Sequence, residues 1–367
     1  MNGKISVRER LECLALEWRH PFSGAKAARR IERAALSNSV TAHVGTLTIV
    51  DPKDWMNRFR AMLRAYPSLA EVAEAFFADH MDFVKKSEES ITGPICVVVE
   101  KNDLERLKTG VGHHRKLGVS RFVVVDNASD DETLEWLSCQ PDVDVVTVKV
   151  PYTTNRREAW VNRVIAHYGA DRWYLVVDSD EMLVYPGCEK REIGDLVEEC
   201  ESEGTVRLRA LMVDMYSKPG YFESGDRSRF LAECVYFDSD TYRRCPRRHL
   251  DLVCGGPRER VFGQAPWLTK YPLFKPGAKG IECKSHFLFP LAENKGTRCD
   301  LFLKHYKFIP GDDKEYERRA KSGAYYNGSL QYRKYVSVIE QETILDFFYP
   351  GTTRYVDSRS FGHLSEL

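Results

Sequence analysis

The segments Arg121–Thr133, RFVVVDNASDDET, and Trp173–Glu181, WYLVVDSDE, decide the fold class of this 367-residue chain. Each begins with a short run of β-branched and aromatic residues and ends in an acidic turn, a pattern typical of a buried strand that stops at a polar loop. Similar apolar runs occur at Ile95–Val99 and Val143–Val150. Helix-length stretches separate the four runs, so the sequence predicts an α/β fold with parallel strands and crossover helices.

We expect three regions along the chain. Residues 1–90 form a helical N-terminal accessory region, with helical patterns at Ala25–Leu36 and Ser68–Val84. Residues 91–310 form the α/β catalytic domain, and residues 311–367 form a C-terminal helical segment packed on it.

Composition excludes several classes of protein. Lys plus Arg and Asp plus Glu are equal at 54 each, so no basic excess points to nucleic acid. The apolar runs are far shorter than the ~20 residues that cross a bilayer, so we expect no transmembrane segment, and peripheral membrane contact stays open. The charged N-terminus lacks a signal-peptide core, and the ten cysteines include no CxxC pair. We therefore expect reduced thiols and a cytoplasmic location.

The strongest chemical signal is Asp178-Ser179-Asp180-Glu181, directly after the strand at 173–177. Ligands of such sheets bind beyond the carboxyl ends of the strands. Hard cations such as Mn²⁺ or Mg²⁺ take oxygen ligands from carboxylates. The sequence therefore predicts a divalent cation at Asp178 and Asp180, with a solvated acidic turn as the alternative.

Two further segments offer ligand-binding groups. Asp126 and Asn127 follow the strand at 122–125, at the same predicted sheet edge, where they can hydrogen-bond a base or a ribose. In Gly255–Arg260, GGPRER, the glycines allow close backbone approach, and Arg258 and Arg260 offer forked donors suited to phosphate. An extended segment would place both arginines on one side. A surface turn with solvated arginines is the alternative.

The run KNDLERLKTGVGHHRKLGVSRFVVVDNASDDET (101–133), followed by LVVDSDE (175–181), resembles the bacterial family 2-type glycosyltransferases. The resemblance covers roughly residues 95–183. It implies the GT-A fold, a Rossmann-like nucleotide-diphospho-sugar transferase sheet. It also implies transfer of a sugar from a UDP- or GDP-sugar to a glycan or lipid-linked acceptor, with inversion and a Mn²⁺ or Mg²⁺ ion, in bacterial surface glycan synthesis.

Carried over residue by residue, the resemblance places Asp126 on the nucleotide and Asp178 and Asp180 on the metal and diphosphate. A C-terminal histidine often completes the metal shell in GT-A enzymes, which favours His305 in KHYK, with His286 next. Together with the residues above, the expected donor-binding residues are Asn102, Asp126, Asn127, Arg157, Asn162, Arg258 and Arg260.

The hydrophobic-Glu-Asp segment that carries the catalytic base in many relatives is missing from this sequence. Asp238 and Glu259 are our candidates for the base, with Asp214 behind them. The base would take the proton of the acceptor hydroxyl as that hydroxyl attacks the anomeric carbon.

Two other functions stay open. A sugar-1-phosphate nucleotidyltransferase shares this sheet architecture, but it needs a glycine-rich loop after the first strand, and residues 100–103 are EKND. A non-catalytic nucleotide-sugar binding protein would keep the sheet without turnover, and the intact DSDE segment argues against that function.

Overall fold

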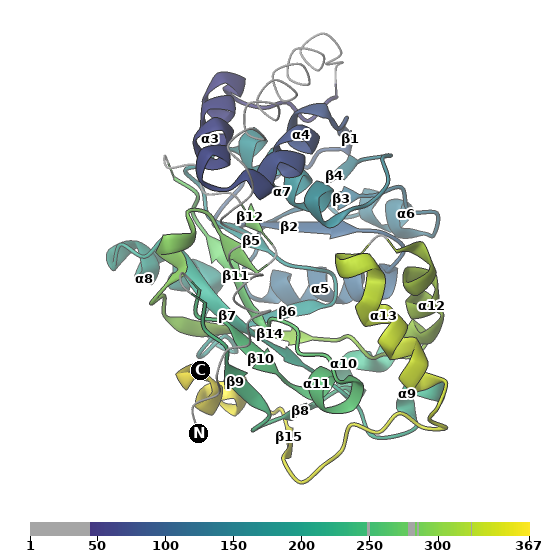
Figure 1. The fold of residues 1–367 in the computed structure, drawn as a ribbon. Coiled ribbons are helices and arrows are strands. Elements are labelled where there is room, and N and C mark those ends of the chain that lie inside the picture. Colours follow the sequence, from purple (N-terminus) through teal and green to yellow (C-terminus); the bar gives the residue numbers. More distant parts are fainter. Residues whose placement is uncertain (1–44, 248–249, 278–282, 285, 324) are drawn as a thin grey trace.

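The computed structural model describes residues 45–247, 250–277, 283–284, 286–323 and 325–367. A nine-stranded mixed sheet lies at the centre of the molecule, with helices on both of its faces (Figure 1). Its strands lie in the order β1-β4-β3-β2-β5-β11-β7-β14-β6. Their bounds are β1 Asp82–Lys85, β2 Ile95–Glu100, β3 Arg121–Asp126, β4 Val143–Thr147, β5 Tyr174–Val176, β6 Glu181–Val184, β7 Arg207–Asp214, β11 Thr269–Phe274 and β14 Cys299–His305.

The first half of the sheet has the predicted parallel arrangement. Strands β4, β3, β2 and β5 lie side by side and parallel. This is the 3-2-1-4 order of a Rossmann-like sheet, in which the strand order reverses between the first and the fourth strand, here β2 and β5. The expected α/β class is confirmed.

The second half of the sheet is mixed. Strand β11 is antiparallel to both β5 and β7, β14 is parallel to β7, and β6 closes the edge antiparallel to β14. Segments far apart in the sequence therefore lie side by side at the sheet edge near the end of β5.

Alternating side chains of the strands build two separate cores. Val97 packs into the cluster under one face, whereas Val98 packs into the cluster under the other, as the two-residue period of a strand requires. The helices that contribute to the Val97 side are α3 Pro52–Ala65, α4 Ala70–Ala78 and α7 Thr154–Tyr168. Those that contribute to the Val98 side are α5 Leu104–Lys116, α6 Thr133–Ser138 and α8 Ile193–Ser202.

The N-terminal region differs from the expected helix at Ser68–Val84. Helix α4 ends at Ala78, and β1 then pairs antiparallel with β4 at the edge of the main sheet. Strand β1 forms here because the edge of β4 offers unpaired backbone groups, which a local sequence pattern cannot reveal. The expected helix at Ala25–Leu36 lies outside the described residues.

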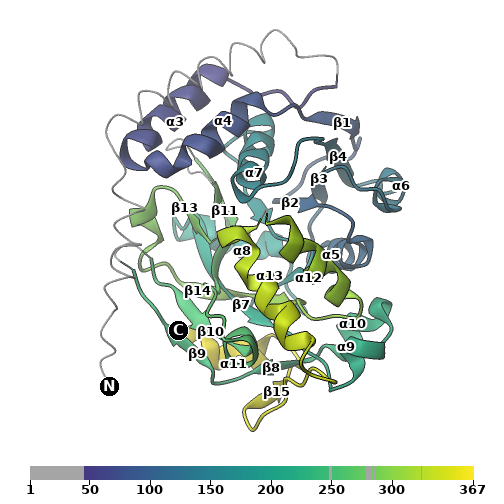
Figure 2. The ribbon, with the colours of Figure 1, turned by 45° about the vertical axis from the view of Figure 1, so that its right-hand side comes forward.

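The C-terminal segment is helical only in part. Helices α12 (Asp312–Ser322) and α13 (Tyr326–Ile339) lie side by side in both views (Figures 1 and 2). After them, β15 (Thr352–Arg354) pairs with β8 (Tyr236–Asp238), and η4 (Ser358–Glu366) packs into the core on the Val98 side of the sheet. The other short elements are α9 Tyr221–Ser224, α10 Phe230–Glu233, α11 Pro257–Phe262, β9 Tyr242–Arg244, β10 Val253–Gly255, β12 Cys283–Lys284, β13 Phe287–Leu288, η1 Pro67–Leu69, η2 Arg227–Arg229 and η3 Leu291–Asn294.

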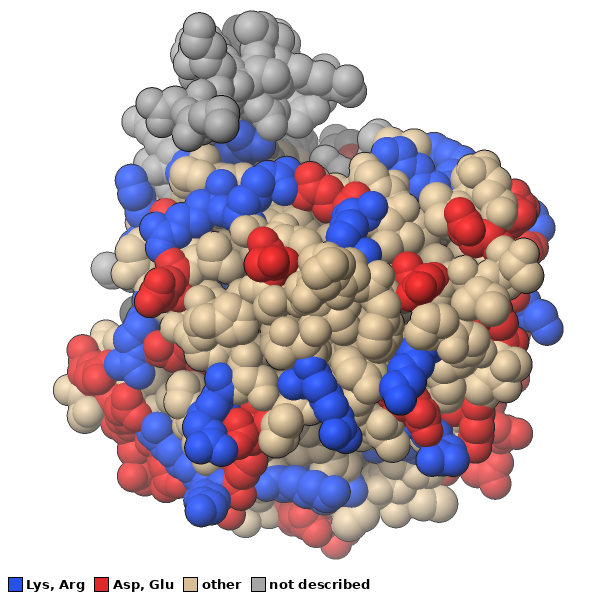
Figure 3. All heavy atoms as spheres, turned by 90° about the horizontal axis from the view of Figure 1, so that it is seen from below, with Lys and Arg blue, Asp and Glu red and all other residues tan. Residues whose placement is uncertain are grey.

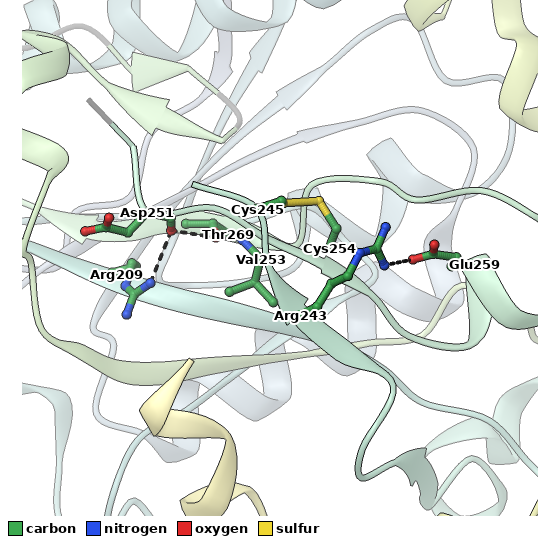
Figure 4. The surroundings of a disulfide bond; sticks show 8 residues. All are labelled: Arg209, Arg243, Cys245, Asp251, Val253, Cys254, Glu259 and Thr269. Carbon is green, nitrogen blue, oxygen red and sulfur yellow. Dashed lines mark hydrogen bonds and ion pairs between the residues drawn. A yellow bond between two sulfur atoms is a disulfide. The ribbon is translucent and has the colours of Figure 1, made fainter. Parts of the chain in front are cut away.

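A disulfide joins Cys245 to Cys254 (Figure 4). The expectation of reduced thiols is therefore wrong for this pair. The two cysteines are nine residues apart, and the antiparallel pairing of β9 with β10 brings them together. Spacing rules for CxxC motifs cannot reveal a pair that a hairpin creates.

The structure bears on two expectations from composition, the lack of a transmembrane segment and the balance of surface charge. Among the described residues, no helix is both long and apolar enough to cross a membrane. On the face seen from below, Lys and Arg are interspersed with Asp and Glu (Figure 3). This mixture agrees with the equal numbers of basic and acidic residues in the sequence.

Candidate functional site

The acidic segment 178–181 lies at the part of the sheet where Rossmann-like folds bind their ligands. It connects β5 to β6, next to the point between β2 and β5 where the strand order reverses. The backbone N–H of Glu181 donates to the carbonyl of Asp178 (3.0 Å), and the N–H of Asp178 donates to the Glu181 carboxylate (3.1 Å). The segment is thus a tight turn that fixes the direction of its carboxylates.

Strand pairing brings His305 to this turn. His305, the last residue of β14, is opposite Glu181 in β6 and opposite Asp214 in β7. One ligand atom each of Asp180, Glu181 and His305 lies within 4.8 Å of the others, so that the three could hold a metal ion together. Two carboxylates and an imidazole suit Mn²⁺ better than Mg²⁺, which prefers oxygen ligands alone.

The imidazole of His305 is oriented by a second carboxylate. Its Nδ1 lies 2.5 Å from Oδ1 of Asp214, and its Nε2 lies 3.3 Å from Oδ2 of Asp180. Although burial opposes it, the Asp180 carboxylate raises the pKa of His305. A carboxylate on the far nitrogen is the usual partner of a metal-binding histidine, because it fixes the ring and the tautomer. The donor set and its orientation therefore fit a divalent cation.

Asp178 has a different environment from the one expected of a metal ligand. Its Oδ1 accepts from Arg157 Nη2 (2.5 Å), and its Oδ2 accepts from Lys270 Nζ (2.8 Å). Although burial opposes it, Arg157 holds the pKa of Asp178 below its usual range. Lys270 also pairs with Glu181. Asp178 thus pairs with two cations, whereas Glu181 lies with Asp180 and His305 in the candidate metal group. The role of Asp178 as a metal ligand stays a prediction.

The sequence interpretation did not include Glu181 in the candidate metal group or Lys270 among its neighbours. Glu181 was visible as the third carboxylate of DSDE. Lys270 was not, because it reaches the site only through the antiparallel insertion of β11 between β5 and β7.

Asp126 and Asn127 lie at the end of β3 and support the loop there. The Asp126 carboxylate accepts from the backbone N–H of Ser129 (3.2 Å) and is fully buried. The Asn127 side chain donates to the carbonyls of Val148 (3.0 Å) and Val150 (2.9 Å). Both side chains therefore hold backbone at the sheet edge.

Asn102 and Asn162 also bind backbone. Asn102 is exposed after β2, and its Oδ1 accepts from the N–H of Asp130 (2.9 Å), which ties the loops after β2 and β3 together. Asn162 is buried within α7 and donates to the carbonyl of Glu158 (2.8 Å). A direct role of either residue in donor binding stays a prediction.

The GGPRER segment is not extended as expected. Pro257 begins helix α11, and Gly256 precedes it with a φ of 75° that favours glycine. Arg258 donates to Asp214 (2.8 Å), and Arg260 donates to Asp238 (2.8 Å). Both guanidinium groups expected to bind phosphate therefore pair with carboxylates of the chain.

The two candidate bases differ in accessibility. Asp238 is fully buried and accepts from Tyr216 (2.9 Å) and Thr241 (2.9 Å) as well as from Arg260. Glu259 is half-buried and pairs with Arg243 near the disulfide (Figure 4).

No known family model and no curated protein sequence matches the chain. A mannosyltransferase, PcManGT from Pyrobaculum calidifontis in complex with GDP-Man and Mn²⁺, is similar over 48% of this chain and 46% of its own, at 13% identity and a TM-score of 0.25. HddC from Yersinia pseudotuberculosis is similar over 50% of this chain and 74% of its own, at 9% identity and a TM-score of 0.26. This chain thus spans about half the length of the first.

Proposed function

We propose that this chain transfers a sugar from a nucleotide diphosphate to a hydroxyl acceptor, with a divalent cation at Asp180, Glu181 and His305. The observation that carries the proposal is the convergence of these three side chains beside the strand-order reversal. Nucleotide ligands bind at that point of Rossmann-like sheets.

The residues of the chain would prepare the site in three ways. Asp214 would hold the His305 ring so that Nε2 faces the cation. Arg157 and Lys270 would fix Asp178 and keep the DSDE turn rigid. Asp126 would keep the loop after β3 in place next to the nucleotide. The bound cation would supply positive charge for the departing nucleotide diphosphate.

Among the carboxylates expected to act as base, we favour Glu259. Asp238 is fully buried, and the Asp214 carboxylate is occupied by His305 and Arg258. Glu259 also pairs with a cation, Arg243, but its side chain is 34% exposed, so that an acceptor can reach it. In this proposal Glu259 takes the acceptor proton while the hydroxyl attacks the anomeric carbon with inversion.

A thermal-shift screen of UDP- and GDP-sugars, with and without Mn²⁺, tests the proposed function. We expect at least one nucleotide sugar to raise the melting temperature only when Mn²⁺ is present, because ligands that bind the folded state alone stabilise it. No stabilisation by any nucleotide sugar would contradict the proposal. Formation of a nucleotide sugar from a sugar-1-phosphate and a nucleoside triphosphate would instead favour the nucleotidyltransferase.

A further inference from the structure

The hairpin formed by α12 and α13 is anchored next to the candidate metal group, which consists of Asp180, Glu181 and His305. Asp312, at the start of α12, accepts from Arg106 of α5 (3.0 Å) and from Arg227 (2.9 Å). Arg106 also donates to the carbonyl of Tyr306, the residue after His305 (2.9 Å). The base of the hairpin and the end of β14 are therefore held by the same buried guanidinium group.

The segment between β14 and α12 places a cation, Lys307, near Asp180. Lys307 Nζ lies 3.4 Å from Oδ2 of Asp180 and 5.6 Å from the ring of Tyr332 in α13. Arg319 of α12 donates to the Tyr332 hydroxyl (2.9 Å), and its guanidinium group lies 5.4 Å from the same ring. Lys307, Tyr332 and Arg319 thus form a continuous row that begins at Asp180.

This row starts at the strand ends where we propose that the donor binds, because Asp180 follows β5 and Lys307 follows β14. Burial raises the pKa of Glu100, at the end of β2, well above its usual range. The positive charge of Arg319 partly opposes this rise. The side chains of Arg319 and Lys307 are 21% and 12% exposed, so that solvent reaches both.

Arg319 pairs with Glu315 and Lys307 with Asp180, so both have carboxylate partners within the fold, as the other cations of the site do. Arg157 pairs with Asp178, Arg258 with Asp214 and Arg260 with Asp238. The departing nucleoside diphosphate carries more negative charge than one divalent cation neutralises, and guanidinium groups bind phosphate oxygens in a forked geometry.

We propose that Arg319, positioned by Tyr332 and assisted by Lys307, binds the diphosphate of the nucleotide donor, so that the C-terminal hairpin completes the donor site. This inference rests on the proposed function. It assigns to α12 and α13 the binding of the diphosphate, the group that joins the nucleoside to the sugar.

The chain offers a matched control for Arg319. Arg318 is its neighbour in α12 and pairs with the same carboxylate, Glu315 (2.7 Å), but its side chain is 53% exposed. Only Arg319 also bonds to Tyr332. Arg318→Gln and Arg319→Gln therefore remove the same charge from the same helix.

The experiment measures the affinities of GDP, GMP, UDP and UMP by calorimetry at saturating Mn²⁺. For whichever nucleotide pair binds, we expect Arg319→Gln to weaken the diphosphate at least about tenfold and the monophosphate much less. Arg319→Lys should fall between wild type and Arg319→Gln, because it keeps the charge without the fork. Tyr332→Phe should reduce the preference for the diphosphate, and Arg318→Gln should leave it unchanged.

The results separate the two proposals. Equal diphosphate affinities of Arg319→Gln and Arg318→Gln would overturn the role of the hairpin while the proposed function stands. An equal loss for monophosphate and diphosphate would also overturn it, because it would indicate a general structural role. If the wild type binds none of the four nucleotides, the proposed function itself fails. Circular dichroism melting confirms that each variant is folded.

Discussion

The Nε2 atom of His305 lies 3.3 Å from Oδ2 of Asp180, on a strand that the chain reaches long after the DSDE turn. The proximity predicted from the sequence is therefore present. Its cause is the register of β14, which places His305 opposite Glu181 on one side and opposite Asp214 on the other. The role of His305 as a metal ligand stays a prediction.

Asp214→Asn tests the orientation of His305. The substitution removes the carboxylate that holds Nδ1, so we expect the affinity for Mn²⁺ to fall about 10- to 100-fold by calorimetry. Asp238→Asn is the matched control, because Asp238 is also a buried carboxylate that pairs with an arginine of α11. Equal Mn²⁺ affinities of the two variants would contradict the proposed role of Asp214.

A comparison of Asp178→Asn with Glu181→Gln tests which carboxylate joins Asp180. We expect Glu181→Gln to weaken Mn²⁺ binding more than Asp178→Asn does, because Glu181 lies within ligand distance of Asp180 and His305. Both carboxylates pair with Lys270, and Asp178 pairs with Arg157 as well. Asp178→Asn should instead lower the free energy of unfolding by about 1–2 kcal/mol, since it weakens two ion pairs of a partly exposed group. The reverse order of Mn²⁺ affinities would restore Asp178 as the ligand.

The disulfide should contribute to stability. In Cys245→Ser/Cys254→Ser the short loop is no longer closed, and we expect the free energy of unfolding to fall by about 2–3 kcal/mol in denaturant titrations. Cys139→Ser, at an exposed free cysteine, should have little effect. An unchanged stability of the double variant under non-reducing conditions would show that the pair does not stabilise the folded chain.

His113 should make the fold sensitive to acid. Burial lowers the pKa of His113 to about 4 from a usual 6.5, so the unfolded chain takes up this proton first as the pH falls. Stability should therefore be lost between pH 6.5 and 4, by about 1 kcal/mol at pH 5.5 from this group. Urea titrations across this range should show a smaller loss for His113→Gln than for wild type. The exposed His363 provides the control, and equal losses in His113→Gln and His363→Gln would contradict the assignment.

The parallel half of the sheet could be predicted because its information is local. Runs such as RFVVVD are buried on both faces and end in polar turns, so their composition alone indicates strands and the edge where DSDE lies. The order of the strands then follows from the handedness and shortness of the connections.

The surroundings of the site could not be predicted, because they depend on long-range pairing. Lys270 reaches Asp178 only because β11 enters antiparallel next to β5. Arg258 and Arg260 offered phosphate-binding groups in the sequence, but the fold places Asp214 and Asp238 against them. No local pattern marks which carboxylate a distant arginine will meet.

The central claim is best tested by measuring turnover of the donor identified in the screen, in Mn²⁺, in EDTA and in Asp180→Ala. We predict turnover with Mn²⁺, its loss in EDTA, its recovery when Mn²⁺ is added back, and its absence in a folded Asp180→Ala variant. Wild-type turnover in EDTA, or in Asp180→Ala, would contradict a metal-dependent transfer centred on Asp180, Glu181 and His305.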